Sequence, residues 1–384
     1  MQRRTFLNSA VFAAAACAGP LRAAARHGAQ AAAALGADPA GVRLERIQAS
    51  GHFRDGCFHN LRTTASAPDP ARSSALLKFL LDDAPHARPC VRLPSVKTDL
   101  SALPDGRLVW LGHSGFFLQL PAFRIAVDPA LHACFPVQTF FKPFAGADIY
   151  RPQDIPSLDV LIFTHDHYDH LDMRTAVELK ERTARVICPL GVGAHLEYWG
   201  WEAERITELD WGESFQLSAK RRISCVPAQH FSGRALQRNL TLWAGFVLQL
   251  DGLCVYFSGD GGYGPHFREI ASSFPRIDLA VVEDGQYSCD WPDIHLLPDA
   301  WKTAVGDLGA RVVLPCHNSK FKLSHHGWCE PLQTARLGAC SLNAALSTPL
   351  IGQAVPLDNA ACGTNAWWEG LESSQAGRPT RTRL

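Results

Sequence analysis

The chain has 384 residues, 47% of them hydrophobic, and its 37 basic residues balance its 37 acidic residues. This length and composition fit one large globular domain with extensions. Because no excess of positive charge is available to hold a phosphate backbone, the composition argues against a nucleic-acid-binding protein.

The first 25 residues have the pattern of an export signal. Arg3 and Arg4 precede Thr5-Phe6-Leu7 and an alanine-rich apolar run that is too short to span a bilayer. This pattern is typical of the twin-arginine route, so we expect a periplasmic or exported protein. The alternative is a disordered basic terminus. Cys17 is a candidate for lipid anchoring, although the leucine that usually stands three positions before such a cysteine is missing.

Residues 26–100 are expected to form an N-terminal extension that packs on the main domain. The stretch is polar and rich in Ala, Pro and Arg, but Phe53-Arg54-Asp55-Gly56 and Leu76-Leu77-Lys78-Phe79-Leu80 supply apolar side chains for packing. The main domain is expected over residues 101–370. A Ser/Gly/Arg/Thr-rich tail over residues 371–384 is expected to be disordered.

Short strands and helices alternate within the main domain. Strand-like runs separated by turns begin at Arg107, and helical spacing appears over residues 172–182 and 300–308. Two halves of this kind, each with strands followed by helices, predict an α/β fold. The arrangement that fits is a single-domain, four-layer αββα sandwich.

A dense group of metal-type ligands follows the apolar run of residues 158–163. The segment Thr164-His165-Asp166-His167-Tyr168-Asp169-His170 places three histidines and Asp169 at offsets 0, 2, 4 and 5, where the strand leads into a turn. Neutral imidazoles and carboxylates are ligands that zinc and similar ions accept. One histidine alone would indicate a hydrogen-bonded loop, but this density favours a metal site.

Three later strand-like runs also end in a candidate ligand, namely His230, Asp260 and His317. Asp260 beside two glycines could be a turn residue, and either histidine alone would be unremarkable. The repeated position at the end of a strand makes them candidates. The full candidate set is His165, His167, Asp169, His170, His230, Asp260 and His317.

The 12 cysteines include no Cys-x-x-Cys pair, which argues against a zinc cluster built from thiolates. Cys188, Cys225, Cys254 and Cys316 lie in apolar runs, where we expect them to be buried. Formation of one or two disulfides after export is an open alternative for the cysteines at loop-like positions. These cysteines are Cys57, Cys90, Cys289, Cys329, Cys340 and Cys362.

Several motifs over residues 108–335 together resemble one family. They are Trp110-Leu111-Gly112-His113-Ser114, the histidine-rich run at 165–172, Glu208-Leu209-Asp210-Trp211 and Gly259-Asp260-Gly261-Gly262-Tyr263. The histidine-rich run is similar to that of the metallo-β-lactamase superfamily. The other motifs resemble its branch of N-acyl-phosphatidylethanolamine-hydrolysing phospholipase D and bacterial relatives.

This resemblance implies a site with two divalent ions, with zinc as the first choice and manganese or iron able to take the same places. His165, His167 and His230 would hold one ion, and Asp169, His170 and His317 the other. Asp260 would bridge the ions, so that Asp169 and Asp260 would serve the chemistry directly. His113 and Asp128 would support the ligands. His295 would lie near the substrate with His326 as a neighbour, or either histidine would be structural or exposed at the surface.

The activity implied by the resemblance is phosphodiester hydrolysis of the phospholipase D type, on N-acyl-phosphatidylethanolamine-like lipids. A water held between the ions would be the nucleophile. The partner would be a lipid or small molecule rather than nucleic acid. The Phe-rich residues 135–144 would contact an acyl chain or membrane surface, or only pack within their loop. The oligomeric state is not predicted.

Two alternatives remain, a lactonase or other acyl hydrolase on the same metals, and a metal-binding envelope protein without catalysis. Glu283 and Asp284 stand where the animal phospholipase has Pro-Ile. Carboxylates facing a phosphate would repel it, so for a phosphodiesterase we expect this pair to point towards ligands or backbone. Lys320 would then help to balance the charge of the phosphate. If the pair faces the open pocket, a lactone or an amide becomes the better substrate.

Overall fold

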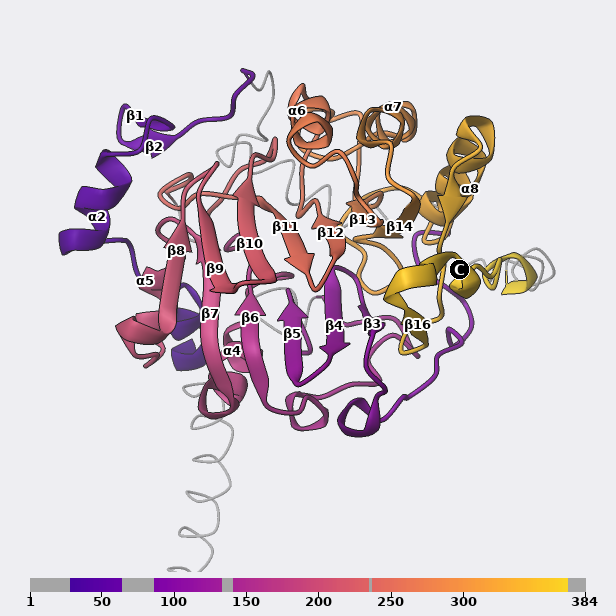
Figure 1. Ribbon diagram of the computed structural model, residues 1–384, viewed down its shortest axis with the longest axis horizontal. Helices are drawn as coiled ribbons and strands as arrows, with labels where there is room; N and C mark the ends of the chain where they lie inside the picture. Colours follow the sequence, from indigo (N-terminus) through magenta and orange to yellow (C-terminus); the bar gives the residue numbers. More distant parts are fainter. Residues whose placement is uncertain (1–27, 64–85, 133–140, 235–236, 372–384) are drawn as a thin grey trace, which may run out of the picture.

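The structure is a computed structural model that describes residues 28–63, 86–132, 141–234 and 237–371 (Figure 1). The expected export signal, the apolar segment at 76–80, most of the Phe-rich segment and nearly all of the tail lie outside these ranges. Among the described residues, no helix combines the length and the apolar character needed to cross a bilayer.

The first sheet has seven strands in the order β16-β3-β4-β5-β6-β7-β8. Its strands are β3 (Arg107–Gly112), β4 (Gly115–Leu120), β5 (Phe123–Val127), β6 (Leu158–Ile162), β7 (Thr183–Pro189), β8 (Ile206–Leu209) and β16 (Ala354–Pro356). Pairing is antiparallel from β16 to β5 and parallel from β5 to β8.

The second sheet repeats this plan in the order β15-β14-β13-β12-β11-β10-β9. Its strands are β9 (Ser214–Ser218), β10 (Arg221–Val226), β11 (Gly245–Leu250), β12 (Leu253–Phe257), β13 (Leu279–Glu283), β14 (Val312–Cys316) and β15 (Ala345–Leu346). Pairing is antiparallel from β9 to β12 and parallel from β12 to β15.

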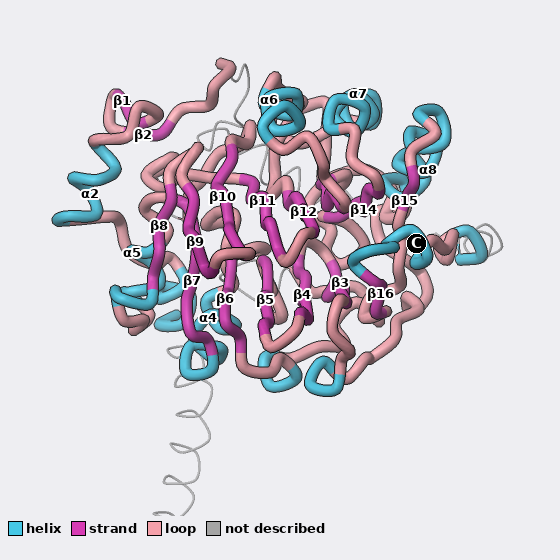
Figure 2. The backbone as a smooth tube through the Cα atoms, viewed as in Figure 1, coloured by secondary structure: helices cyan, strands magenta, loops and turns pink. Residues whose placement is uncertain are grey.

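Helices cover the outer face of each sheet (Figures 1 and 2). On the first sheet lie α4 (Met173–Leu179) and α5 (Gly193–Tyr198), and on the second lie α6 (His266–Ser273), α7 (Pro298–Leu308) and α8 (Glu330–Leu342). Short 3-10 helices occur at Leu100–Ala102, Pro152–Asp154, Lys180–Arg182, Ala203–Arg205 and Leu357–Gly363.

Successive residues of a strand face opposite sides of its sheet and so pack against different layers. In β3, Leu108 and Trp110 belong to the core between the sheets, whereas Val109 and Leu111 pack beneath the helices of the first sheet. Both faces of the sheet are therefore covered, and its strands read as continuous apolar runs. The four-layer αββα prediction is confirmed. The helix expected over residues 172–182 is also confirmed, with its last turn narrowed to a 3-10 helix after Leu179.

The described part of the N-terminal extension packs against the sandwich. It contains α2 (Gly41–Gln48) and a small hairpin of β1 (Phe53–Arg54) and β2 (Cys57–Phe58). Ile47 and Phe58 are fully buried in the central core. Arg43 donates to the Glu208 carboxylate of β8 at 2.7 Å, so both apolar and charged contacts hold the segment in place.

All ten cysteines of the described ranges are free thiols, so the disulfides left open above do not form among them. Cys188, Cys225, Cys254 and Cys316 are buried, as predicted. Cys329 differs from the expectation of a loop position, because it lies at the start of α8 and its side chain joins the central core.

Candidate metal centre

The candidate ligands come from strand ends that meet at one edge of the sandwich. The run from His165 to His170 follows β6, His230 follows β10, Asp260 follows β12 and His317 follows β14. These apolar strands are buried between the layers and fix the point at which each loop begins. The loops carry the polar side chains. The structure therefore brings together residues that are far apart in the sequence.

One group of potential ligand atoms consists of His165, His167, His230 and Asp260, with all of these atoms within 4.8 Å of one another. The Asp260 Oδ2 atom lies 3.8 Å from His165 Nε2 and 3.8 Å from His230 Nε2. His230 Nδ1 donates to the carbonyl oxygen of Ile294 at 2.8 Å, which leaves Nε2 as the lone-pair nitrogen. The group therefore offers imidazole nitrogens and one carboxylate to a single point.

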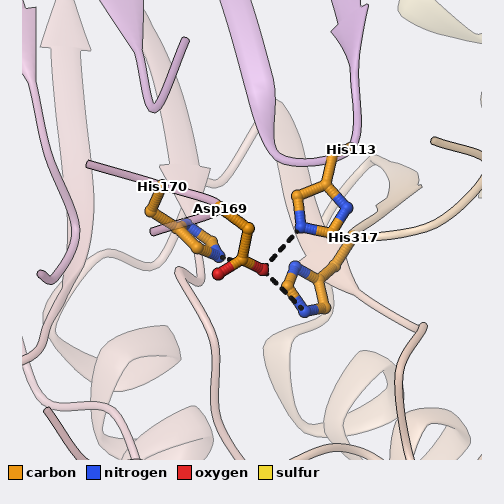
Figure 3. Close-up of side chains that lie close together, drawn as sticks. All are labelled: His113, Asp169, His170 and His317. Carbon is orange, nitrogen blue, oxygen red and sulfur yellow. Dashed lines mark hydrogen bonds and ion pairs between the residues drawn. The ribbon is translucent and has the colours of Figure 1, made fainter. Parts of the chain in front are cut away.

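The second group is His113, Asp169, His170 and His317. In Figure 3 the Asp169 carboxylate points into the space between the three rings. Its Oδ2 atom lies 3.7 Å from His170 Nε2 and 3.9 Å from His317 Nε2. Asp260 also reaches this group, at 3.1 Å from His170 Nε2. Asp260 thus lies between the two groups, where a bridging carboxylate would be placed.

Asp128 and His113 contact the candidate ligands directly. Asp128 accepts hydrogen bonds from the Thr164 backbone N–H at 2.9 Å and from His170 Nδ1 at 2.8 Å, and thereby turns His170 Nε2 towards the site. His113 Nε2 lies 2.8 Å from Asp169 Oδ2. This contact suits a supporting residue, although His113 also belongs to the second group of potential ligands.

The backbone is strained where these side chains emerge. His113, Asp128 and His317 have φ values of 56°, 42° and 66°, in the left-handed region that non-glycine residues rarely occupy. Strain of this kind persists where surrounding structure enforces it, often at functional sites. Gly285 shows how close the packing is, because a Cβ atom there would lie 2.2 Å from the His317 carbonyl oxygen.

The electrostatics of the site suit cation binding. Burial holds the pKa values of His165, His230 and His317 well below the usual histidine value, so these imidazoles are neutral and can act as ligands. Burial also lowers the pKa of His170, but the carboxylates of Asp260 and Asp128 outweigh it and raise that pKa well above normal. A proton is therefore drawn to the place where an ion would bind.

Buried polar atoms whose hydrogen bonding is incomplete point to the same conclusion. Among the described residues, the buried His170 Nε2 and Asp260 Oδ1 atoms make no hydrogen bond of good geometry. Each lies only within ion-pair distance of a neighbour, at 3.1 Å from Asp260 Oδ2 and 3.2 Å from His317 Nδ1 respectively. Burial raises the pKa of Asp260 to about 6. Atoms of this kind are costly unless something outside the protein satisfies them. The donor set fits two divalent ions that share Asp260.

A cavity of about 210 Å³ opens onto both groups. Its lining combines site residues with apolar side chains, namely His167, Asp169, Asp260, His295, His317, Phe231, Trp291, Ile294, Leu323 and Gln286. The position of His295 agrees with the expectation that it lies near the substrate. Sequence reasoning missed Phe231 and Trp291, and only the position of Phe231 beside His230 could have drawn attention to either.

His326 contacts the loops around the cavity. It is not among the residues that line the cavity. Its Nε2 atom accepts a hydrogen bond from the Gln286 backbone N–H at 2.7 Å, and its Nδ1 atom donates to the Gly327 carbonyl oxygen at 2.8 Å. Both ring nitrogens hold the surrounding loops together, which favours the supporting role of the two left open for His326.

Glu283 and Asp284 are buried and do not line the cavity. Glu283 Oε1 accepts a hydrogen bond from the Leu296 backbone N–H at 2.7 Å, and Oε2 from His295 Nδ1 at 2.8 Å. Asp284 Oδ1 accepts a hydrogen bond from Asn318 at 2.7 Å. Burial raises the pKa of both carboxyl groups well above normal. The pair therefore holds His295 and Asn318 in place and does not face the cavity.

Lys320 also differs from its expected role in balancing charge at the substrate. It is buried, and its Nζ atom donates to the carbonyl oxygens of Ala130 at 2.8 Å and Leu111 at 3.2 Å. These contacts direct the ammonium group at the main chain, and Lys320 is not among the residues lining the cavity.

Comparison with known families agrees with this geometry. The profile of the beta-lactamase superfamily domain matches residues 124–318, which contain every candidate ligand from His165 to His317. The chain belongs to this superfamily. It is a metal-dependent hydrolase of the metallo-β-lactamase fold, with a cluster of His and Asp residues that could hold the metals.

Relatives of known sequence or structure extend the comparison. An uncharacterised Mycobacterium tuberculosis protein is 35% identical over 351 residues, covering 88% of this chain and 92% of the relative. N-acyl-phosphatidylethanolamine-hydrolyzing phospholipase D 1 of Caenorhabditis elegans is 32% identical over 207 residues, covering 50% of this chain and 57% of that protein. Igni18, a metallo hydrolase of Ignicoccus hospitalis, is 21% identical with a TM-score of 0.51, covering 65% of this chain and 97% of Igni18. This last similarity shows the shared fold.

Proposed function

We propose that this superfamily member is a two-metal phosphodiesterase of the phospholipase D type, acting on N-acyl-phosphatidylethanolamine-like glycerophospholipids. The observation that carries the proposal is the pair of ligand groups that share Asp260. The similarity to the C. elegans phospholipase supports the choice of substrate. Two bound divalent ions would activate a water as nucleophile and neutralise the charge that develops on the phosphoryl group.

The protein itself would orient the substrate. His295 lies beside Asp260 and His317, and its Nδ1 atom is held by Glu283 at 2.8 Å. With the Nδ1 proton donated to Glu283, the Nε2 atom of the neutral ring carries the lone pair and can accept a hydrogen bond from a water or a substrate hydroxyl or N–H group. Burial lowers the pKa of His295, so the ring is neutral near pH 7 and adds no charge of its own.

The cavity wall suits a substrate with an apolar part next to the reacting group. Phe231, Trp291, Ile294 and Leu323 line one cavity with the candidate ligands. A volume of about 210 Å³ lies below the roughly 300–1,000 Å³ of pockets that enclose a drug-sized ligand. We therefore expect the phosphodiester group to enter the cavity while the acyl chains remain outside it.

The acyl-hydrolase alternative receives less support. A lactone or amide substrate would be favoured if Glu283 and Asp284 faced the open pocket. Both side chains are buried and do not line the cavity. No carboxylate of this pair would then repel a phosphate. A protein without catalysis is also less well supported, because the complete set of candidate ligands converges around one cavity.

A substrate panel tests the proposal. The mature protein, loaded with zinc, is assayed with N-acyl-phosphatidylethanolamine, phosphatidylethanolamine, an acyl lactone and a β-lactam, and products are identified by mass spectrometry. We expect release of phosphatidic acid from the first lipid, abolished by a chelator and restored by zinc. Turnover of the lactone with no lipid cleavage would favour the acyl hydrolase instead.

The double variant Glu283→Ala/Asp284→Asn tests the placement of the acidic pair. Because Glu283 holds His295 and Asp284 holds Asn318, we expect lower metal content or lower stability and no gain in phosphodiester affinity. Tighter phosphodiester binding with unchanged metal content would show that the pair repels the substrate in solution.

A further inference from the structure

Asn60, in the N-terminal extension, contacts the backbone of a candidate ligand 170 residues away. Its side-chain Nδ2 atom donates to the His230 carbonyl oxygen at 2.7 Å, and its Oδ1 atom accepts from the His230 backbone N–H at 3.0 Å. Oδ1 also accepts a hydrogen bond from Trp243 Nε1 at 3.0 Å. Only one orientation of the carboxamide satisfies these three partners.

The contact is important because His230 is a buried candidate ligand that follows the end of a strand. His230 follows the end of β10 and is 1% exposed, so its peptide groups would be costly to leave unpaired. Asn60 satisfies both its N–H and its C=O, and Ile294 fixes the tautomer of the ring. Together these contacts determine where His230 Nε2 points.

Residues next to Asn60 and His230 also link the extension to the loops of the metal centre. The side-chain amide of Gln229 donates to the Arg62 carbonyl oxygen at 3.0 Å. The backbone carbonyl oxygen of Gln229 accepts a hydrogen bond from the Gly262 N–H at 2.8 Å. The extension is thus linked to the loop of His230 and, through Gln229, to the loop that follows Asp260.

An earlier part of the extension contacts the other ligand loop. The Ala34 carbonyl oxygen accepts a hydrogen bond from Arg234 Nε at 2.9 Å. Arg234 Nη1 donates to the carbonyl oxygens of Asp166 and Leu171 at 2.5 and 2.8 Å, on either side of the turn that carries His167 and His170. Arg234 is 5% exposed and therefore couples the extension to this turn through a buried charge.

We infer that the N-terminal extension is part of the metal centre and that Asn60 is a positioning residue for His230. The extension precedes residues 124–318, which match the superfamily domain, so this support comes from outside the shared domain. The inference requires the metal centre but is independent of the substrate proposed above.

Cobalt(II) binding provides a test that needs no substrate. Mature protein freed of metal is titrated with Co²⁺, and the visible absorption bands report the number and affinity of the sites. In Asn60→Leu, which keeps the side-chain size but removes both contacts, we expect one of two sites to weaken by at least about tenfold, the lower bound for loss of ligand support. Asn60→Asp, which keeps the acceptor but loses the donor, should be intermediate.

Arg46→Ala is the matched control, because Arg46 binds Glu213 at 2.6 Å on an exposed part of the same extension. We expect this variant to bind two ions with unchanged affinity. Unchanged binding in Asn60→Leu would overturn the inference, as would an equal loss in Arg46→Ala. If Asn60→Leu does not fold, wild-type affinity at both sites in Asn60→Asp would overturn it. Wild-type protein that binds no ion would instead refute the metal centre itself.

Discussion

Single hydrogen bonds decide which ring nitrogen of His230 and of His170 faces the site. The Ile294 carbonyl oxygen does this for His230 and the Asp128 carboxylate for His170. A neighbouring group that fixes the tautomer raises the affinity of a histidine for metal without touching the ion. The chemistry of the site therefore depends on residues that are not themselves ligands.

His266 predicts a pH dependence of stability away from the metal centre. Burial at the start of α6 lowers the pKa of His266 from 6.5 to about 4. The unfolded chain binds this proton below pH 6.5 and the folded chain only near pH 4, so stability is lost as the pH falls through this window. At pH 5 the effect is about 2 kcal/mol.

The variant His266→Leu should remove this contribution. We expect its free energy of unfolding, measured with urea at pH 7 and pH 5, to fall by about 2 kcal/mol less than that of the wild type. An equal fall in both proteins would show that His266 takes up its proton in the folded state.

The candidate ligands could be predicted from the sequence because they are crowded in one motif or end a strand-like run. Asn60 could not, since its role arises from contacts between distant segments. Asn60 has no motif around it, and its partner His230 lies 170 residues further on. The choice between the supporting and substrate-near roles of His326 could not be made from the sequence, because it depends on contacts with Gln286 and Gly327 that only the fold brings about.

At the level of elements, α4 closes the loop that carries the histidine-rich motif. Its N-cap residue, Asp172, accepts a hydrogen bond from the Arg174 backbone N–H at 3.2 Å. The same carboxylate accepts from the His132 backbone N–H at 3.1 Å. One buried side chain thus starts the helix and ties it to the segment after Asp128.

Asp172→Ala should destabilise the protein by about 1–2 kcal/mol, because loss of an N-cap leaves the first helical N–H groups without an acceptor. Chemical denaturation measures the change, with the exposed Asp38→Ala as control. A variant as stable as the control would mean that the cap contributes nothing.

Strand-like runs were easier to predict than short helices. The runs before His165, Asp260 and His317 are β6, β12 and β14 as expected, because each is apolar and ends in a turn. The 6-residue α5 did not stand out, since fewer than two turns give no clear helical period. The change from α-helix to 3-10 helix after Leu179 also depends on packing, which the spacing of apolar residues in the sequence does not reveal.

At the scale of the whole molecule, the two sheets follow the same plan and place their ligand-bearing loops at one edge. The extension crosses from α2 to Asn60 and reaches the same edge. Equal numbers of basic and acidic residues leave no net charge that would attract a polyanion, which agrees with a small-molecule or lipid substrate.

Export through the twin-arginine route remains a prediction from the sequence. We expect the double change Arg3→Lys/Arg4→Lys to leave the protein in the cytoplasm with its leader uncleaved, because this route requires the arginine pair. Cell fractionation with mass spectrometry of the N-terminus measures both properties. Normal appearance of the variant in the periplasm would contradict the assignment.

The number of metal ions per chain tests the central claim most directly. Elemental analysis is made of the mature wild type and of Asp260→Ala, both purified in zinc-supplemented buffer. The shared position of Asp260 predicts two divalent ions in the wild type, and fewer in the variant with activity reduced by more than roughly 100-fold. Wild-type protein that retains no metal under these conditions would contradict the account.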